Sequence, residues 1–140
     1  MKIRQFTQGD RQAVIELWET CELTRPWNNP NTDIDRKIQF QPELFLVGAI
    51  GTNVIASAMA GYDGHRGSLY YFAVHPNHQG KGHGQQLMTD IEQRLISLGC
   101  PKLNTSIRTT NTAVLEFYTH LDYITDEVLS IGKRLIPDTQ

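Results

Sequence analysis

Three apolar runs near the middle of the chain predict strands joined by short turns. Residues 44–50 are almost continuously apolar, which is typical of a strand buried on both faces. Residues 51–53 (Gly-Thr-Asn) form a turn signal, so residues 54–62 are expected to return as the antiparallel partner. A second turn over residues 63–67 leads into the third run, residues 68–74. The centre of the chain therefore predicts three strands linked by hairpins.

Apolar residues spaced three and four apart predict two long helices, over residues 8–21 and residues 85–98. Thr7 and Asp10 can start the first helix with a capping box, in which Asp replaces the usual Glu or Gln. Gly99 stands where a left-handed glycine commonly ends a helix. Both helices carry one apolar stripe, as expected of helices that flank a sheet.

The remaining elements are shorter. In chain order they are a strand over residues 2–6, a helix that begins at Thr32 or Asp33, a strand over residues 102–108, a helix over residues 114–121 and a strand-like segment over residues 123–134. Residues 137–140 are expected to be a frayed tail. The order β-α-α-β-β-β-α-β-α-β predicts one α+β domain that spans residues 1–140.

Composition excludes several classes of function. With a net charge of −2 and no basic run, the chain has no nucleic-acid footprint. No apolar segment approaches the roughly 20 residues of a membrane span, and the N-terminus has no signal-peptide core. Cys21 and Cys100 are the two cysteines, and their separation indicates neither a disulfide framework nor a metal site. We expect a cytoplasmic protein without a metal.

A glycine-rich loop joins the third strand to the second long helix, with Gly80, Gly82 and Gly84 at alternate positions. Glycines let backbone amides turn inward, and the first amides of a helix lack internal partners at its positive end. The loop therefore predicts a site for a phosphate or pyrophosphate. The Walker pattern does not fit, because Lys81 is followed by glycine, and the dinucleotide fingerprint has another spacing. The alternative is a simple turn between strand and helix.

The loop resembles the acetyl-CoA loop of the GNAT superfamily of N-acetyltransferases. The shared features are Gln79-x-x-Gly82-x-Gly84 and the preceding Val74-His75-Pro76. Residues 61–67 (GYDGHRG) are similar to the bacterial YpeA group of this family. The resemblance implies the GNAT fold, a mixed central sheet flanked by helices. Asp122 stands where the family usually has glycine, and the C-terminal region is short, so the far wall of the acceptor cleft is open to question.

The resemblance also implies a cosubstrate, acetyl-CoA, and residues that bind it. These are Phe72 and Val74 through their backbone, the loop residues Gln79, Gly80, Lys81, Gly82, His83, Gly84 and Gln85 around the pyrophosphate, and Asn111. Asn111 and Tyr118 have the spacing of a second family signature, in which the tyrosine protonates the departing thiolate. Asn111 is equally a good helix cap, and Tyr118 could be an ordinary core residue.

The implied function is N-acetyl transfer to a primary amine of a small molecule or a peptide by direct attack. The alternative is an acyl-CoA-binding module with little or no turnover. The candidate acceptor residues are Trp27, Tyr62, Asp63, His65 and Tyr70, and the candidates to attract an amine are Asp33, Asp63 and Glu127. Trp27 could instead pack beneath its own loop.

No general base is visible in the sequence. The strand before the glycine loop carries no acid, so Asp63, His65 and Tyr70 are the nearest candidates for a base. The acceptor and the acyl-chain preference are likewise open. A homodimer is common in the family, but nothing in the sequence specifies one.

Overall fold

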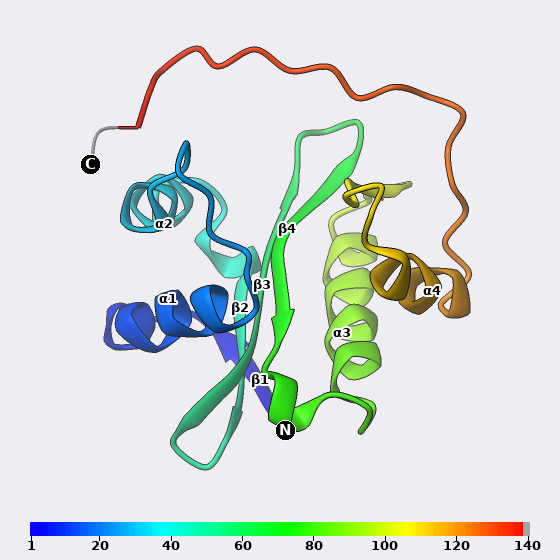
Figure 1. The fold of residues 1–140 in the computed structure, drawn as a ribbon. Helices are drawn as coiled ribbons and strands as arrows, with labels where there is room; N and C mark the ends of the chain where they lie inside the picture. Colours follow the sequence, from blue (N-terminus) through cyan, green and yellow to red (C-terminus); the bar gives the residue numbers. More distant parts are fainter. Residues whose placement is uncertain (139–140) are drawn as a thin grey trace.

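The computed structural model describes residues 1–138, which form one mixed sheet with helices on both faces (Figure 1). The strands are β1 (Lys2–Gln5), β2 (Phe45–Ile50), β3 (Asn53–Tyr62), β4 (Gly67–Val74) and β5 (Leu103–Thr105). They lie side by side in chain order; β1 to β4 are antiparallel, and β5 runs parallel to β4. The three central strands joined by hairpins confirm the pattern expected from the apolar runs.

The helices divide the core into two layers. They are α1 (Arg11–Thr20), α2 (Pro30–Ile38), α3 (His83–Ser97) and α4 (Thr112–His120). On one face of the sheet, Trp18 of α1 and Ile34 of α2 pack against Phe45. On the other face, Leu87 of α3 and Tyr118 of α4 belong to the second buried cluster. No helix within residues 1–138 is long and apolar enough to cross a membrane.

The helices α1 and α2 begin at other residues than expected. Asn29 caps α2 by accepting hydrogen bonds from the N–H groups of Asn31 and Thr32, so the predicted start at Thr32 or Asp33 is wrong. Pro30 explains the earlier start, because its fixed φ suits the first helical position and its missing N–H costs nothing there. At α1 the capping box of Thr7 and Asp10 is confirmed, with a short 3₁₀ turn before the helix.

The C-terminal part of the chain is not a strand. Residues 124–138, which we call the strap, have no regular structure and run from the end of α4 across to α2 (Figure 1). The strand-like segment expected over residues 123–134 is therefore wrong. Asp122 ends the turn after α4 with a left-handed φ of 68°, and farther along the strap Leu129 and Ile131 are more than nine-tenths exposed. Apolar residues alone did not make a strand here.

The far end of the strap is anchored rather than frayed. The Asp138 carboxylate accepts a hydrogen bond from the Asn29 N–H at 2.7 Å and pairs with Arg36 and Arg134. These contacts, the Asn29 N–H foremost, lower the pKa of Asp138 to about 2. The expected frayed tail is thus wrong at residue 138, and residues 139–140 lie outside the described part.

Candidate active site

The C-terminal half of β4 has a free outer edge, because β5 pairs only with the N-terminal half. β4 pairs with β5 only where Gly67, Ser68 and Leu69 face residues 103–105. Beyond Leu69 the outer edge of β4 has no strand beside it among residues 1–138. The His75 N–H bonds to Ile55 on the inner side, so strand alternation points the groups of Val74 to the open edge. Unpaired strand edges bind extended ligands through backbone hydrogen bonds.

A bulge at Tyr71 turns a backbone donor into this opening. Tyr71 has a left-handed φ of 51°, and the register between β3 and β4 shifts at this point. The Tyr71 carbonyl faces β3, where it accepts a hydrogen bond from the Ser57 hydroxyl at 2.9 Å. Because the peptide is trans and planar, the Phe72 N–H points the opposite way, toward the open edge. This is the place that the sequence assigned to the Phe72 backbone.

A buried polar chain holds the bulge. Trp18 donates from Nε1 to the Ser57 hydroxyl at 2.9 Å, and Ser57 in turn donates to Tyr71. The Trp18 and Tyr71 rings stack with centroids 3.8 Å apart. Trp18 and Ser57 are both fully buried. Helix α1 thus fixes the backbone geometry of β4 across the sheet.

Replacing Ser57 with alanine is expected to destabilise the protein by about 2–6 kcal/mol. The change leaves two buried groups, the Trp18 N–H and the Tyr71 carbonyl, without this partner, at about 1–3 kcal/mol each. Urea unfolding measures the loss. Ser97→Ala is the control, because Ser97 is exposed on α3 and should change stability by no more than about 0.5 kcal/mol. A loss below about 1 kcal/mol at Ser57 contradicts the role of this chain.

The glycine loop presents a row of free backbone donors. No residue in positions 1–138 accepts a hydrogen bond from any N–H group between residue 80 and residue 85. Gly80 and Gly82 have φ values of +75° and +86°, which only glycine adopts without strain. The first bond of α3 runs from Gln86 to Gly82, so the donors before it face out of the helix. This 15-residue helix begins at His83, close to the start that the glycine loop predicted near Gly84.

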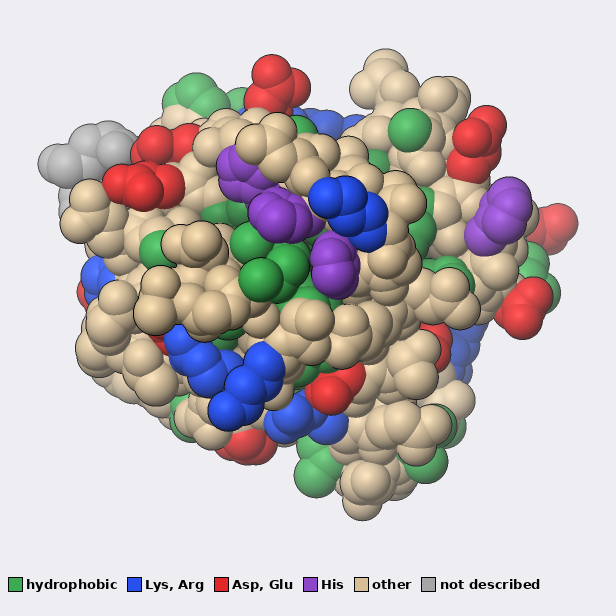
Figure 2. Space-filling model, turned by 90° about the horizontal axis from the view of Figure 1, so that it is seen from below, with side chains coloured by type: hydrophobic (Ala, Val, Ile, Leu, Met, Phe, Trp, Pro, Cys, Tyr) green, Lys and Arg blue, Asp and Glu red, His purple; other side chains and the backbone are tan. Residues whose placement is uncertain are grey.

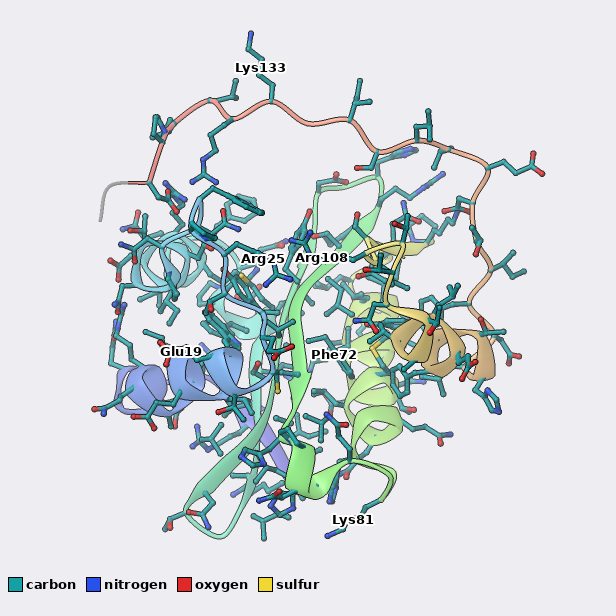
Figure 3. The ribbon with its side chains drawn as sticks, viewed as in Figure 1. Glu19, Arg25, Phe72, Lys81, Arg108 and Lys133 are labelled. Atoms are coloured by element: carbon teal, nitrogen blue, oxygen red, sulfur yellow. The ribbon has the colours of Figure 1, made fainter. Side chains whose placement is uncertain are left out.

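Three histidines and Lys81 lie beside these donors (Figure 2, Figure 3). His75, His78 and His83 form a chain of rings with successive centroids 6.1 and 6.2 Å apart. Figure 2 looks onto this side of the molecule and shows histidines gathered beside a basic side chain. Lys81 projects from the tip of the loop (Figure 3). Desolvation first, then Lys81 and the two neighbouring histidines, lower the pKa of His78. The predicted residues Lys81 and His83 are thus beside the donors, and both stay predictions as cofactor ligands.

Three other predicted cofactor residues make contacts inside the protein. The Gln79 side-chain amide donates to the Val74 carbonyl at 2.9 Å and ties the loop to the strand edge. At Gly84 an added Cβ would lie 3.0 Å from Phe117, so glycine here lets α3 pack closely on α4. Asn111 caps α4 by accepting from the Val114 N–H, as the sequence allowed. These contacts are compatible with cofactor binding but do not require it.

Tyr118 lies where β4 and β5 separate. Its side chain is 4% exposed and its ring lies 6.2 Å from that of Phe72, which is on the same side of β4 (Figure 3). Burial raises the pKa of Tyr118 to about 12, and a hydrogen bond with Thr105, the last residue of β5, acts in the opposite direction. The phenol is therefore neutral at physiological pH, and it can donate a proton.

A cavity of about 300 Å³ on the α2 side of the sheet gathers part of the predicted acceptor set. Tyr62, Asp63 and Tyr70 line it, together with Asp33 and Lys37. Trp27 and His65 do not line this cavity. Trp27 is 56% exposed, so it does not pack beneath its own loop either, and Glu127 is exposed on the strap.

One contact of Asp33, which lines this cavity, could not be predicted from the sequence. The Tyr71 hydroxyl donates to the Asp33 carboxylate at 2.6 Å. Asp33 belongs to α2 and Tyr71 to β4, and helical spacing does not reveal which strand a helix will face. A tyrosine at a bulge is also indistinguishable in sequence from any other strand tyrosine.

Comparison with known proteins gives consistent results. The sequence profile of the acetyltransferase (GNAT) family matches residues 11–123. An acetyltransferase of Yersinia pestis is 50% identical over 140 residues, which cover 100% of this chain and 99% of the relative. An acetyltransferase of Pectobacterium atrosepticum is 48% identical over the same shares of the two chains.

Solved structures share the fold at low sequence identity. Ard1 from Thermoplasma volcanium superposes with a TM-score of 0.79 at 22% identity, over 88% of this chain and 82% of that one. The structure of AAC(6')-Iy in complex with the bisubstrate analogue CoA-S-monomethyl-acetylneamine has a TM-score of 0.77 at 17% identity, over 95% and 97% of the two chains.

The open edge of β4, its bulge and the loop of free amides define a protein of the acyltransferase class. The chain belongs to the acetyltransferase (GNAT) family. This membership confirms the family, the α+β fold and the enzyme class that the sequence predicted.

Proposed function

We propose that the protein transfers the acetyl group of acetyl-CoA to a primary amine of a small molecule or a peptide. The observation that carries the proposal is the row of N–H groups from residue 80 to residue 85, none bonded to a described residue, at the start of a long helix. Such a row is suited to a pyrophosphate, and helix-end charge contributes about 0.3–1 kcal/mol when exposed and up to about 2 when partly buried.

The chemistry assigned to this chain is positioning and polarisation. The backbone at Phe72 and Val74 would hold the extended arm of acetyl-CoA along the open edge of β4. A backbone N–H aimed at the thioester oxygen stabilises the charge that develops there, and the Phe72 N–H points into this opening. Tyr118 would give its proton to the departing thiolate as the amine attacks. The acceptor amine would bind on the α2 side, in the cavity beside the bulge.

A calorimetric titration with acetyl-CoA tests the cofactor assignment. We expect saturable binding with a dissociation constant in the micromolar range, which corresponds to about −8 kcal/mol. Absence of binding means that the glycine loop is only a turn, and the proposal then fails. Release of free thiol in the presence of amines separates a transferase from a module that only binds acyl-CoA. We place the protein in the cytoplasm on composition, and a homodimer stays a prediction.

A further inference from the structure

The pair formed by Asp33 and Tyr71 lies between the cavity and the bulge of β4. The Tyr71 hydroxyl donates to one oxygen of the Asp33 carboxylate at 2.6 Å, and Arg36 lies 3.4 Å from the other oxygen. The Asp33 side chain is 21% exposed, so a ligand in the cavity can reach it. Tyr70, the residue before the bulge, lines the same cavity. The pair therefore faces the place where an acceptor would meet the open strand.

The other charged groups of the cavity are engaged elsewhere. Lys37 is buried and donates from Nζ to the Ala60 carbonyl at 2.5 Å. One Asp63 oxygen accepts the N–H groups of His65 and Arg66 at 2.8 Å each, so this carboxylate closes the β3–β4 hairpin. Arg36 is shared between Asp33 and the end of the strap at Asp138. Asp33 is thus the carboxylate of the cavity whose strongest partner is a neutral group, the phenol of Tyr71.

The surroundings keep this phenol in its protonated form. Burial first, and then the hydrogen bond to Asp33, raise the pKa of Tyr71. Stacking on Trp18 and the strained backbone of the bulge fix the direction of the ring. Tyr71 therefore orients the carboxylate and does not compete with it for a proton.

We propose that Asp33, oriented by Tyr71, binds the ammonium group of a cationic amine acceptor and takes the proton that this nitrogen loses. Tyr62 and Tyr70 in the cavity wall add aromatic faces, which attract cations. This inference rests on the proposed function and adds the general base and the charge of the acceptor. Of the bases suggested by sequence, Asp63 is engaged in the hairpin and His65 lies outside the cavity. Tyr70 lines the cavity, but its hydroxyl has no carboxylate bonded to it among the described residues.

The proton balance of the step is simple. The acceptor enters as an ammonium ion and passes one proton to the Asp33 carboxylate, which releases it to solvent. The free amine attacks the thioester carbon, a C–N bond forms and the C–S bond breaks. The sulfur takes up one proton, for which Tyr118 is the proposed donor, and Tyr118 is recharged by the second proton that the nitrogen loses. The net products are an amide, the free thiol of CoA and one proton.

Asp33→Asn tests the proposal, because asparagine keeps the size and still accepts the Tyr71 hydroxyl. The assay is thiol release from acetyl-CoA with kanamycin, spermidine and tetraalanine as amine probes, from about pH 6 to about pH 9. We expect kcat/KM for the amine to fall about ten- to hundredfold. The dissociation constant of acetyl-CoA should stay within twofold, so that the loss is confined to the use of the amine. Tyr71→Phe should reproduce part of the loss, without additivity in the double variant.

Asp35→Asn is the matched control. Asp35 is on the same helix and also pairs with an arginine, Arg11, but it does not line the cavity. We expect its kcat/KM to stay within twofold of the wild type. Equal effects at Asp33 and Asp35, or an unchanged kcat/KM for the amine in Asp33→Asn, overturn the proposal, while turnover by the wild type keeps the proposed function. No turnover by the wild type with any probe counts against both.

Discussion

Gly82→Glu is expected to weaken acetyl-CoA binding at least a hundredfold, a loss of about 2.7 kcal/mol or more. Gly82 stands in the middle of the free N–H groups, with open space where a Cβ would lie. A glutamate there places a carboxylate where the pyrophosphate would bind, so the effect combines steric blocking with repulsion of like charges. Calorimetric titration with acetyl-CoA measures the loss directly.

Gly51→Glu provides a control that matches both the strain and the charge. Gly51 has a left-handed φ of +59° and no heavy atom within 4 Å of the point where a Cβ would lie, but it belongs to the turn between β2 and β3. Both variants should lose about 1–2 kcal/mol of stability from the left-handed backbone. Only Gly82→Glu should lose binding. Equal affinity in the two variants rules out the loop as the cofactor site.

Tyr118→Phe is expected to lower kcat about 10²- to 10³-fold and to leave the affinity for acetyl-CoA unchanged. The ring keeps its contacts with Phe72 and Phe117, so the change removes only the proton donor. Because burial raises the pKa of Tyr118 to about 12, the wild-type phenol stays protonated over the whole assay range, and its titration should not limit the rate below about pH 11. Steady-state kinetics and calorimetry together separate turnover from binding.

Tyr123→Phe is the companion variant. Tyr123 packs on Tyr118 with ring centroids 5.3 Å apart, but its hydroxyl donates to Glu92 at 2.6 Å. Loss of that hydroxyl should cost stability, about 1.5–3 kcal/mol for a bond to a charged group, and leave kcat within threefold. If both variants lose turnover equally, the packing of the two rings, rather than the hydroxyl of Tyr118, supports catalysis, and the assignment of Tyr118 as proton donor fails.

The parts of the site that sequence predicted are those set by local rules. The left-handed φ of Gly80 and Gly82 could be predicted because glycine adopts it without strain. The free amides could be predicted because the first N–H groups of a helix have no partner within it. The hairpin strands could likewise be predicted from local signals, namely the apolar runs and the turn residues between them. Asn111 could be predicted as a cap from its position before a helix.

The parts that sequence missed depend on contacts between distant segments. Asp33 meets Tyr71 only because α2 packs on the face of the sheet to which the Tyr71 side chain points, and nothing within either element encodes that packing. The strap does not form a strand, because a strand needs a neighbouring strand to pair with and apolar side chains alone do not provide one. β5 is likewise shorter than predicted, with pairing confined to residues 103–105, since the sheet opens after Leu69.

The buried chain from Trp18 through Ser57 to Tyr71 also has an evolutionary consequence. A change at one of these positions leaves a neighbour's buried polar group unpaired, so single substitutions are costly. Compensation requires a second change at a position at least 14 residues away in the chain. We therefore expect α1, β3 and β4 to be coupled in evolution at these three positions, and sequence changes on the acceptor side to accumulate around them.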